Sequence, residues 1–496
     1  MRRLILLAML AILSGCASFS HRNVEIKEKG AYSGRATRTI TDYRGKKDVL
    51  VLLALSGGGS RAACFSSAVM LQLQKVYEDL DMLQEVDVIS SVSGGSVAAA
   101  YYAISGDPRD NEDSPLMVRA RISGDFRLDT LPPDLRNRVT YDKKNRLLAV
   151  QPRLSPEDKE KIKAALERPE DSEIVERLYA FSQIEVKSGR AWHPETVREV
   201  MRRDYIGRWI GNWFWPDNIV CYWFTAYDRS DIMAQTFADN IYDERHLGRD
   251  LELRDIHPER PYVIINATDA TRDPKKDPFA SPFTFTYEDF KDITSDINTY
   301  QIAWAVMGSA AFPSVFNYVT LRNFTYTSEE GKRFVHVFDG GMYDNLGLES
   351  LGNIIRDVDK ECENVPHCKY KNIIVILVDA YAKSKGIDDS DADPRSGFSY
   401  VVDFNFLDAV DGLLTSNRDK ELEKFRKMDR ERGEKFIFWQ ISFQDLKEKD
   451  LKKTVDRIPT NFKISESDAD SIDQAVQELV SPSNPKLQRI RKILLE

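Results

Sequence analysis

Ser93 stands in a sequence context that suits a reactive hydroxyl. It lies in the run Ser-Val-Ser-Gly-Gly, after the apolar residues 86–89 and before the alanine-rich residues 97–104. A sharp turn from strand to helix presents such a hydroxyl at a helix N-terminus, where unpaired N–H groups favour developing negative charge. The turn needs small neighbours, and Ser91 and Gly95 are small. This context predicts a nucleophile elbow, although Ser-x-Gly by itself is common in turns.

Three consecutive glycines, Gly57, Gly58 and Gly59, follow the continuous apolar run Val49–Leu55. Glycines let backbone N–H groups turn toward a pocket, where such donors stabilise the oxyanion of a tetrahedral intermediate. Similar loops cradle phosphate, but the Gly-Lys-Ser/Thr of a P-loop is absent, and a dinucleotide fingerprint would need glycine at Ala62. The loop therefore predicts oxyanion stabilisation rather than nucleotide binding.

Asp339 follows the apolar residues 334–338 and precedes Gly340 and Gly341. An aspartate at a strand end beside two glycines can face a cleft as a general base, although Asp-Gly turns are common. Of the six histidines only His336 lies near a motif, and strand alternation turns it to the face opposite Asp339. A carboxylate is a weak base, so we expect Asp339 to need partial burial or a short hydrogen bond to Ser93.

In this order the motifs resemble those of the patatin-like phospholipase family: a glycine-rich loop with a following arginine, here Arg61, then G-x-S-x-G, then D-G-G/A. The run AVMGSAAFP, residues 305–313, also resembles a helix of that family, and the likeness covers roughly residues 49–378. The resemblance implies that Ser93 is the nucleophile, that Asp339 is its base, and that the glycine loop with Arg61 binds the oxyanion. One departure is Ser91 in place of the first elbow glycine; a serine is small enough to fit there, with strain in the turn and lower activity as the alternative.

The resemblance implies a serine acyl hydrolase, of phospholipase or lipase type, that cleaves lipid esters through a Ser-Asp dyad and an acyl-enzyme. No cofactor is implied, and no metal, since H-E-x-x-H and EF-hand patterns are absent. Two alternatives remain open at this point: a non-catalytic lipid-binding or scaffolding protein on the same fold, and a thioesterase or small-ester hydrolase.

The segments that position these residues alternate between strands and helices, which predicts an α/β fold with a mainly parallel sheet. The resemblance implies a three-layer sandwich. We expect a large, mostly helical insertion at about residues 106–250 and a helical C-terminal extension at about 400–496, with a helix capped by Ser465. The predicted strands are residues 49–55, 86–89, 262–266, 334–338, 373–378 and 436–443.

The chain begins Met-Arg-Arg, continues with the apolar residues 4–13, and reaches Leu-Ser-Gly-Cys at Cys16. This layout is typical of a secretory signal peptide, and its end resembles the lipobox of bacterial lipoproteins. We expect residues 1–15 to be removed, Cys16 to be lipidated, residues 16–47 to form a polar tether, and residues 48–496 to form the hydrolase domain. By resemblance, Ala17 favours the outer membrane, facing the periplasm. An ordinary signal peptide is the alternative.

Composition limits the possible partners. The chain has 496 residues, of which 42% are hydrophobic and 30% charged, with a net charge of -9. Loss of Arg2 and Arg3 with the leader would make this -11, so a general nucleic-acid binder is not expected. No later segment offers about eighteen consecutive apolar residues, so we expect attachment to a membrane through lipid alone. The oligomeric state is left open.

Aromatic residues crowd residues 209–224, which hold four of the seven tryptophans. They suit either core packing of the insertion or contact with lipid, and the sequence does not separate these readings.

The five cysteines do not make a disulfide-built scaffold. Cys362 and Cys368 lie close together, and an exported compartment favours a disulfide between them over free thiols or a zinc site with His367. Cys64 and Cys221 lie in apolar surroundings and are predicted to be buried.

Overall fold

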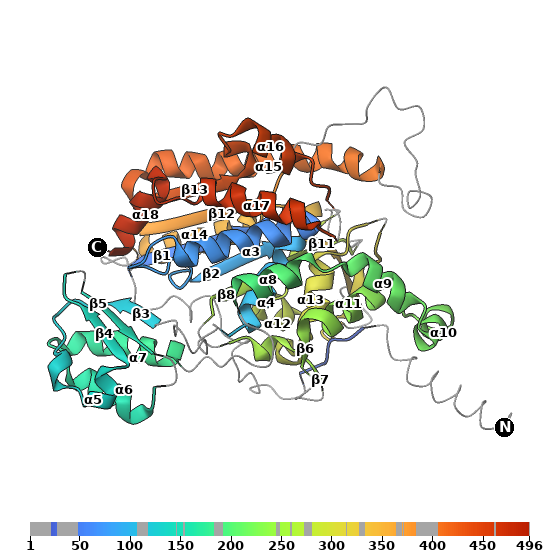
Figure 1. The fold of residues 1–496 in the computed structure, drawn as a ribbon. Coiled ribbons are helices and arrows are strands. Elements are labelled where there is room, and N and C mark those ends of the chain that lie inside the picture. Colours follow the sequence, from blue (N-terminus) through green and yellow to red (C-terminus); the bar gives the residue numbers. More distant parts are fainter. Residues whose placement is uncertain are drawn as a thin grey trace, which may run out of the picture.

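A mixed eight-stranded sheet forms the centre of the computed structural model, in the order β10-β11-β8-β2-β1-β12-β13, with β9 paired to β8 (Figure 1). Strands β8, β2, β1, β12 and β13 are parallel. Strands β9 and β11 pair antiparallel with β8, and β10 pairs antiparallel with β11. The strands are β1 Val49–Leu55, β2 Val88–Val92, β8 Tyr262–Asp269, β9 Ser281–Thr284, β10 Val319–Arg322, β11 Phe334–Asp339, β12 Asn372–Asp379 and β13 Phe436–Ser442.

The structure describes fifteen stretches of the chain: residues 21–26, 48–106, 118–144, 146–151, 154–182, 192–244, 249–257, 260–271, 280–313, 315–326, 333–363, 370, 372–382, 405–460 and 463–495. The predicted leader, Cys16, most of the tether and Cys368 lie outside these residues.

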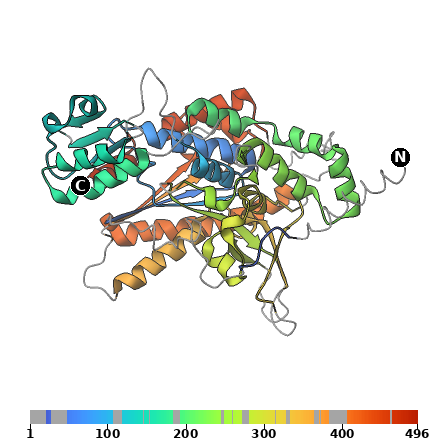
Figure 2. The same ribbon diagram turned by 90° about the horizontal axis from the view of Figure 1, so that it is seen from below.

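The central strands are apolar on both faces because helices cover both sides of the sheet. In β1, Val51, Leu53 and Leu55 join one core, whereas Leu50 and Leu52 join another. The first core is packed by α3 Gly59–Lys75, α4 Gly94–Ile104, α13 Ile302–Ser309 and α17 Glu466–Leu479. The second is packed by α14 Leu348–Glu363 and α15 Asn405–Arg432. Figure 2 shows these helix layers on either side of the sheet, which confirms the predicted α/β sandwich.

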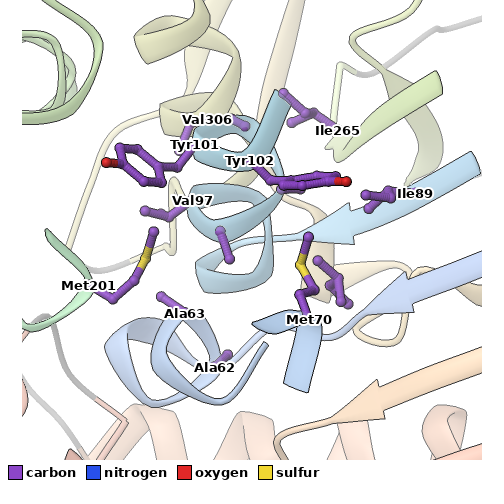
Figure 3. Close-up of a cluster of buried hydrophobic side chains, with 14 of the residues drawn as sticks. Ala62, Ala63, Met70, Ile89, Val97, Tyr101, Tyr102, Met201, Ile265 and Val306 are labelled. Atoms are coloured by element: carbon purple, nitrogen blue, oxygen red, sulfur yellow. The ribbon is translucent and has the colours of Figure 1, made fainter. Parts of the chain in front are cut away.

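The core between α3, α4 and β2 fixes the helices that follow the glycine loop and the elbow. Met70 from α3 and Tyr101 and Tyr102 from α4 are at most 2% exposed. Figure 3 shows Met70 and Tyr102 on the side of Ile89 of β2, and Tyr101 on the other side of α4 with Met201. Dense packing of this kind holds the N-termini of both helices in place above the sheet.

The first part of the insertion adds a small sheet to the expected helices. It contains a three-stranded antiparallel sheet, β3-β5-β4, beside three helices, and it has a hydrophobic core of its own at one end of the molecule (Figure 1). These elements are β3 Val118–Arg121, β4 Val139–Asp142, β5 Leu147–Val150, α5 Pro133–Arg136, α6 Pro156–Ala164 and α7 Ser172–Ser182. Each strand has only four residues, too few for a periodic signal in the sequence.

The second part of the insertion is helical and leads back to the main sheet. It comprises α8 Pro194–Arg202, α9 Tyr205–Trp213, α10 Pro216–Phe224 and α11 Arg229–Phe237, followed by the short strands β6 Asp243–Glu244 and β7 Arg249–Asp250. Helix α12 Tyr287–Asp292 comes later, after β8 and β9, and lies outside the insertion. Within the described residues no helix is both long and apolar enough to cross a bilayer.

The C-terminal extension follows the prediction closely. Helix α15 and strand β13 are present, and they are followed by α16 Lys449–Asp456, α17 and α18 Pro485–Leu495. The Ser465 hydroxyl accepts the backbone N–H of Asp468 at 3.1 Å, so Ser465 caps α17 as expected. Cys64 and Cys221 are both buried as predicted. Cys64 is a free thiol and Cys221 is disulfide-bonded, which leaves too few of the five cysteines for both a Cys362–Cys368 disulfide and a lipidated Cys16.

Candidate active site

Ser93 occupies a strained turn between β2 and α4. Its φ of 50° lies in the left-handed region, which a side chain other than glycine rarely adopts. Its backbone N–H donates to the Ser309 hydroxyl at 2.9 Å, so the turn is held by a side chain from α13. Ser93 is 7% exposed and stands as N-cap residue of α4. This is the geometry that the sequence predicts for an elbow.

Asp339 lies within hydrogen-bonding reach of Ser93. Its carboxylate accepts a hydrogen bond from the Ser93 hydroxyl, and it accepts the Gly341 N–H at 2.8 Å. Burial raises the pKa of Asp339 to about 6, although these two hydrogen bonds lower the pKa in part. The carboxylate is therefore more basic than an exposed aspartate yet ionised at neutral pH, as a base for a serine hydroxyl requires.

The glycine loop lies against the elbow. A Cβ placed on Gly57 would stand 3.4 Å from the Cβ of Ser93, and the Gly57 N–H already donates to the Asn345 carbonyl at 2.9 Å. Gly58 and Gly59 have φ values of 137° and 57°, and in the described part of the chain their N–H groups make no hydrogen bond. Because α3 begins at Gly59, these two donors also sit at a positive helix end. They are the candidates for binding an oxyanion.

Two close approaches explain why glycine follows Ser93. A Cβ on Gly94 would lie 1.9 Å from the carbonyl oxygen of Gly59, and one on Gly95 would lie 2.6 Å from that of Leu55. Both positions bring the start of α4 against the backbone at the end of β1 and the glycine loop. The elbow and the oxyanion loop are thereby packed as one unit.

Ser91 fits the structure through hydrogen bonds. Its hydroxyl donates to the Ile264 carbonyl at 3.1 Å and accepts from the Ser96 hydroxyl at 3.1 Å. It is fully buried in β2. Strain therefore does not arise at Ser91, and the positive φ falls on Ser93 itself.

A buried polar network beneath the elbow was not predicted. Ser309 accepts the Ser93 N–H, contacts the Ser96 hydroxyl at 2.9 Å and donates to the Asn266 carbonyl at 2.6 Å. The Asn266 amide donates to the Ser90 hydroxyl and to the Ser91 carbonyl, both at 2.9 Å. Five serines, Ser93 through its backbone N–H, and an asparagine thus join β2, α4, α13 and β8. Single serines carry no sequence signal of this kind, because only the fold brings them together.

Asn345 is a second site residue that the sequence analysis missed. Its Oδ1 lies 2.2 Å from the position a Gly57 Cβ would take and 2.7 Å from that of Gly341. The amide therefore stands between the glycine loop and the turn that holds Asp339. It comes six positions after Asp339 with no recognisable pattern of its own.

Arg61 is buried and anchors the glycine loop from behind. Its Nε donates to the Ala380 carbonyl at 3.1 Å and its Nη1 to the Ile458 carbonyl at 2.7 Å. These contacts tie the first turn of α3 to the end of β12 and to the C-terminal extension. These contacts support a role for Arg61 in positioning the loop. Its predicted part in oxyanion binding stays a prediction.

His336 lies away from the dyad. Its Nδ1 contacts the Thr320 hydroxyl at 3.0 Å, and its ring lies 4.3 Å from that of Tyr318. Burial lowers the pKa of His336. Side chains three positions apart on β11 point to opposite faces, as the alternation predicts, so His336 is not a third member of the site.

No cluster of metal-binding side chains occurs among the described residues. The site residues brought together are Ser93, Asp339 and the glycine loop, whereas the predicted lipidation site, Cys16, falls outside the described chain.

The chain has been compared with known proteins in sequence and in structure. The search of curated proteins finds no match. Among solved structures, the crystal structure of VipD from Legionella pneumophila is similar, with 11% identity and a TM-score of 0.27 over 96% of this chain and 70% of VipD. The sequence pattern that describes patatin-like phospholipases matches residues 53–351, more than half of the chain, and this span contains Ser93 and Asp339. The chain belongs to the patatin-like phospholipase family.

Proposed function

We propose that the protein is a serine acyl hydrolase that cleaves lipid esters with Ser93 as nucleophile and Asp339 as base. The observation that carries the proposal is the hydrogen bond between the Ser93 hydroxyl and the buried Asp339 carboxylate, beside the N–H groups of Gly58 and Gly59. Membership of the phospholipase family supports a lipid substrate. A protein that only binds lipid would not need a serine hydroxyl bonded to a buried carboxylate beside two N–H donors, so this arrangement favours the hydrolase over the non-catalytic alternative.

In the first half-reaction the Ser93 oxygen attacks the ester carbonyl carbon while Asp339 takes the hydroxyl proton. The carbonyl oxygen becomes an oxyanion, and the N–H groups of Gly58 and Gly59 donate to it. Collapse of this intermediate breaks the bond to the alcohol oxygen, which leaves with the proton held by Asp339. The product is an acyl ester on Ser93.

In the second half-reaction water replaces the alcohol. Asp339 takes a proton from the water as its oxygen attacks the acyl carbon. The same two N–H groups hold the oxyanion, and its collapse releases the carboxylic acid while the proton returns to the Ser93 oxygen. No cofactor is required for either step.

We also propose that the mature chain is a lipoprotein anchored through Cys16 in a bacterial envelope, on the periplasmic face of the outer membrane. The lipobox-like run before Cys16 supports this, as does a lipid substrate that lies in membranes. Mass spectrometry of the chain purified from membranes tests it: an acylated Cys16 as the first residue is expected, and an unmodified later N-terminus would contradict it.

The hydrolase proposal is tested by lipid mass spectrometry after incubation with purified protein. We expect the wild type to release fatty acid from phospholipid vesicles and Ser93→Ala to release none. Hydrolysis of thioesters or short soluble esters only would favour the small-ester hydrolase. Equal activity of both proteins, or no hydrolysis of any ester by the wild type, would overturn the proposal.

A further inference from the structure

The most exposed large apolar side chains of the described residues belong to α9, α10 and their junction. Phe214, Trp215, Trp223 and Phe224 are 62–74% exposed, and every other large hydrophobic side chain there is less than half exposed. Aromatic side chains of this size usually lie inside a protein or an interface. Four of them within eleven residues make a surface that water solvates poorly.

The exposed side chains follow one face of α10. Trp215, Ile219 and Trp223 are four positions apart, so they line a single stripe along the helix. Between Arg208 and Asp228 the only charged residue is Asp217, in a chain that is 30% charged. A helix with this stripe and so little charge suits the boundary between headgroups and acyl chains, where tryptophan is enriched.

The remaining aromatics hold this surface rigidly. Trp209 is 4% exposed and donates its indole N–H to the Arg229 carbonyl at 3.0 Å. The rings of Trp213 and Tyr222 lie 5.1 Å apart and join α9 to α10. The aromatic cluster thus divides into a packed part and an exposed part, and only the packed part is explained by core formation.

The packed part also joins this surface to the candidate active site. The rings of Trp209 and Phe316 lie 5.4 Å apart, and Phe316 lies between α13 and β10. In the same loop the Ala311 carbonyl accepts the backbone N–H of Asp339 at 3.1 Å. Figure 1 shows α9 and α10 projecting from the body beside α11 and α13.

The first described residues lie on this side as well. Arg22 pairs with Asp231 of α11 at 3.8 Å, and α11 packs against α9; Figure 1 shows both at the end of the molecule away from the β3-β5-β4 lobe. Cys16 is six residues before Arg22, a span of at most about 20 Å of extended chain. An acyl anchor at Cys16 would therefore enter the membrane on the side where α10 projects.

We propose that α10 is a membrane-docking helix that places Trp215, Ile219 and Trp223 in the interface of a lipid bilayer and holds the site entrance at the lipid surface. The partner is the bilayer itself, recognised by apolar contact rather than by charge. This proposal rests on the proposed function for the lipid substrate and the anchor.

Quenching of tryptophan fluorescence by phosphatidylcholine vesicles with brominated acyl chains tests the docking. The full-length chain carries Ser93→Ala, so that the vesicles stay intact and the result does not depend on hydrolysis. Trp215→Phe/Trp223→Phe keeps the apolar stripe and removes its two fluorophores, whereas Trp215→Ala/Trp223→Ala removes the stripe. Tyr326→Ala, an aromatic side chain that is 40% exposed elsewhere, is the matched control.

We expect strong quenching in the parent and in the Tyr326→Ala control, and loss of most quenching in the phenylalanine variant while that variant stays on the vesicles. Equal quenching in the parent and the phenylalanine variant would overturn the proposal, because the quenched tryptophans would then lie elsewhere. Absence of quenching in the parent would also overturn it and leave the surface to a protein partner. Hydrolysis that fails in the wild type, with quenching as expected, would refute the proposed enzyme but not the docking.

Discussion

The polar network under Ser93 and the aromatic stripe on α10 are both exceptions to the usual distribution of side chains, in which polar groups are exposed and large apolar groups are buried. Ser90, Ser91, Ser96 and Ser309 are completely buried, whereas Trp215 is 62% exposed. Burial of polar groups costs free energy unless each is hydrogen-bonded, and exposure of tryptophan leaves apolar surface in water. In the first region the cost is offset by hydrogen bonds that fix the elbow. In the second no partner in the described chain offsets it, which points to a partner outside.

The network contributes to both stability and activity, whereas the stripe contributes to the interaction with lipid. Removing one group from the network leaves a buried partner unsatisfied, so stability and activity fall together. Removing an exposed aromatic side chain leaves the folded chain intact, so only the interaction with lipid changes. The following expectations run from the largest effect to the smallest.

Ser93→Ala removes the nucleophile and has the largest expected effect. Ester hydrolysis should fall by about a thousandfold or more, because the step then lacks covalent catalysis. Loss of a side chain from a residue at φ 50° does not relieve the backbone, so the melting temperature should change little. Residual activity within tenfold of wild type would refute the dyad.

Asp339→Asn should abolish hydrolysis and yet stabilise the fold at neutral pH. Folding raises the pKa of Asp339 from 3.8 to about 6, so its ionisation opposes folding increasingly as the pH rises through that interval and by a constant amount above it. The asparagine cannot ionise, and it should raise the free energy of unfolding at pH 7 by as much as about 3 kcal/mol. Denaturant unfolding at pH 7 and pH 4 measures this, and most of the gain should be lost at the lower pH.

The same pKa sets the pH dependence of the wild type. Asp339 must be ionised to take the serine proton, so the rate should fall as the pH drops through about 6. Asp289→Asn is the control, because burial also raises the pKa of Asp289 while the side chain bonds Thr284 rather than Ser93. That variant should keep the wild-type pH profile, and a shifted profile in Asp289→Asn would argue against Asp339 as the base.

Ser309→Ala tests the network directly. It removes the acceptor of the Ser93 N–H and the donor to the Asn266 carbonyl, which should cost about 1–3 kcal/mol of stability. Activity should fall by about tenfold or more because the elbow loses its support. Ser67→Ala removes a buried serine hydroxyl that bonds only the Cys64 carbonyl and should leave activity unchanged. Equal activity losses in both would contradict a specific role for the network.

Trp215→Ala/Trp223→Ala should have the smallest effect on the fold. The free energy of unfolding should change by less than about 0.5 kcal/mol per site, since both side chains are exposed. Hydrolysis of a dissolved short-chain ester should stay at the wild-type rate, and hydrolysis of vesicle phospholipid should fall about tenfold or more. An equal loss on both substrates would place the defect in the site instead of in docking.

The sequence was sufficient where one segment carries its own signal. Strand β1, the elbow at Ser93 and the cap at Ser465 each depend on neighbouring residues, and all were predicted. The network of Ser309, Asn266 and Ser96 was not, because its members meet only after β2, α4, α13 and β8 have assembled. The strands of four residues in the insertion were missed for a different reason, since a segment that short shows no periodicity.

Labelling with a fluorophosphonate tests the central claim most directly, because the probe reacts only with an activated serine. Its phosphorus bonds the serine oxygen, fluoride leaves, and the hydroxyl proton passes to the base. Peptide mass spectrometry should find a single adduct on Ser93, formed more slowly below pH 6 and absent from Asp339→Asn. An adduct on another serine, or none on the folded wild type, would contradict the Ser93–Asp339 dyad.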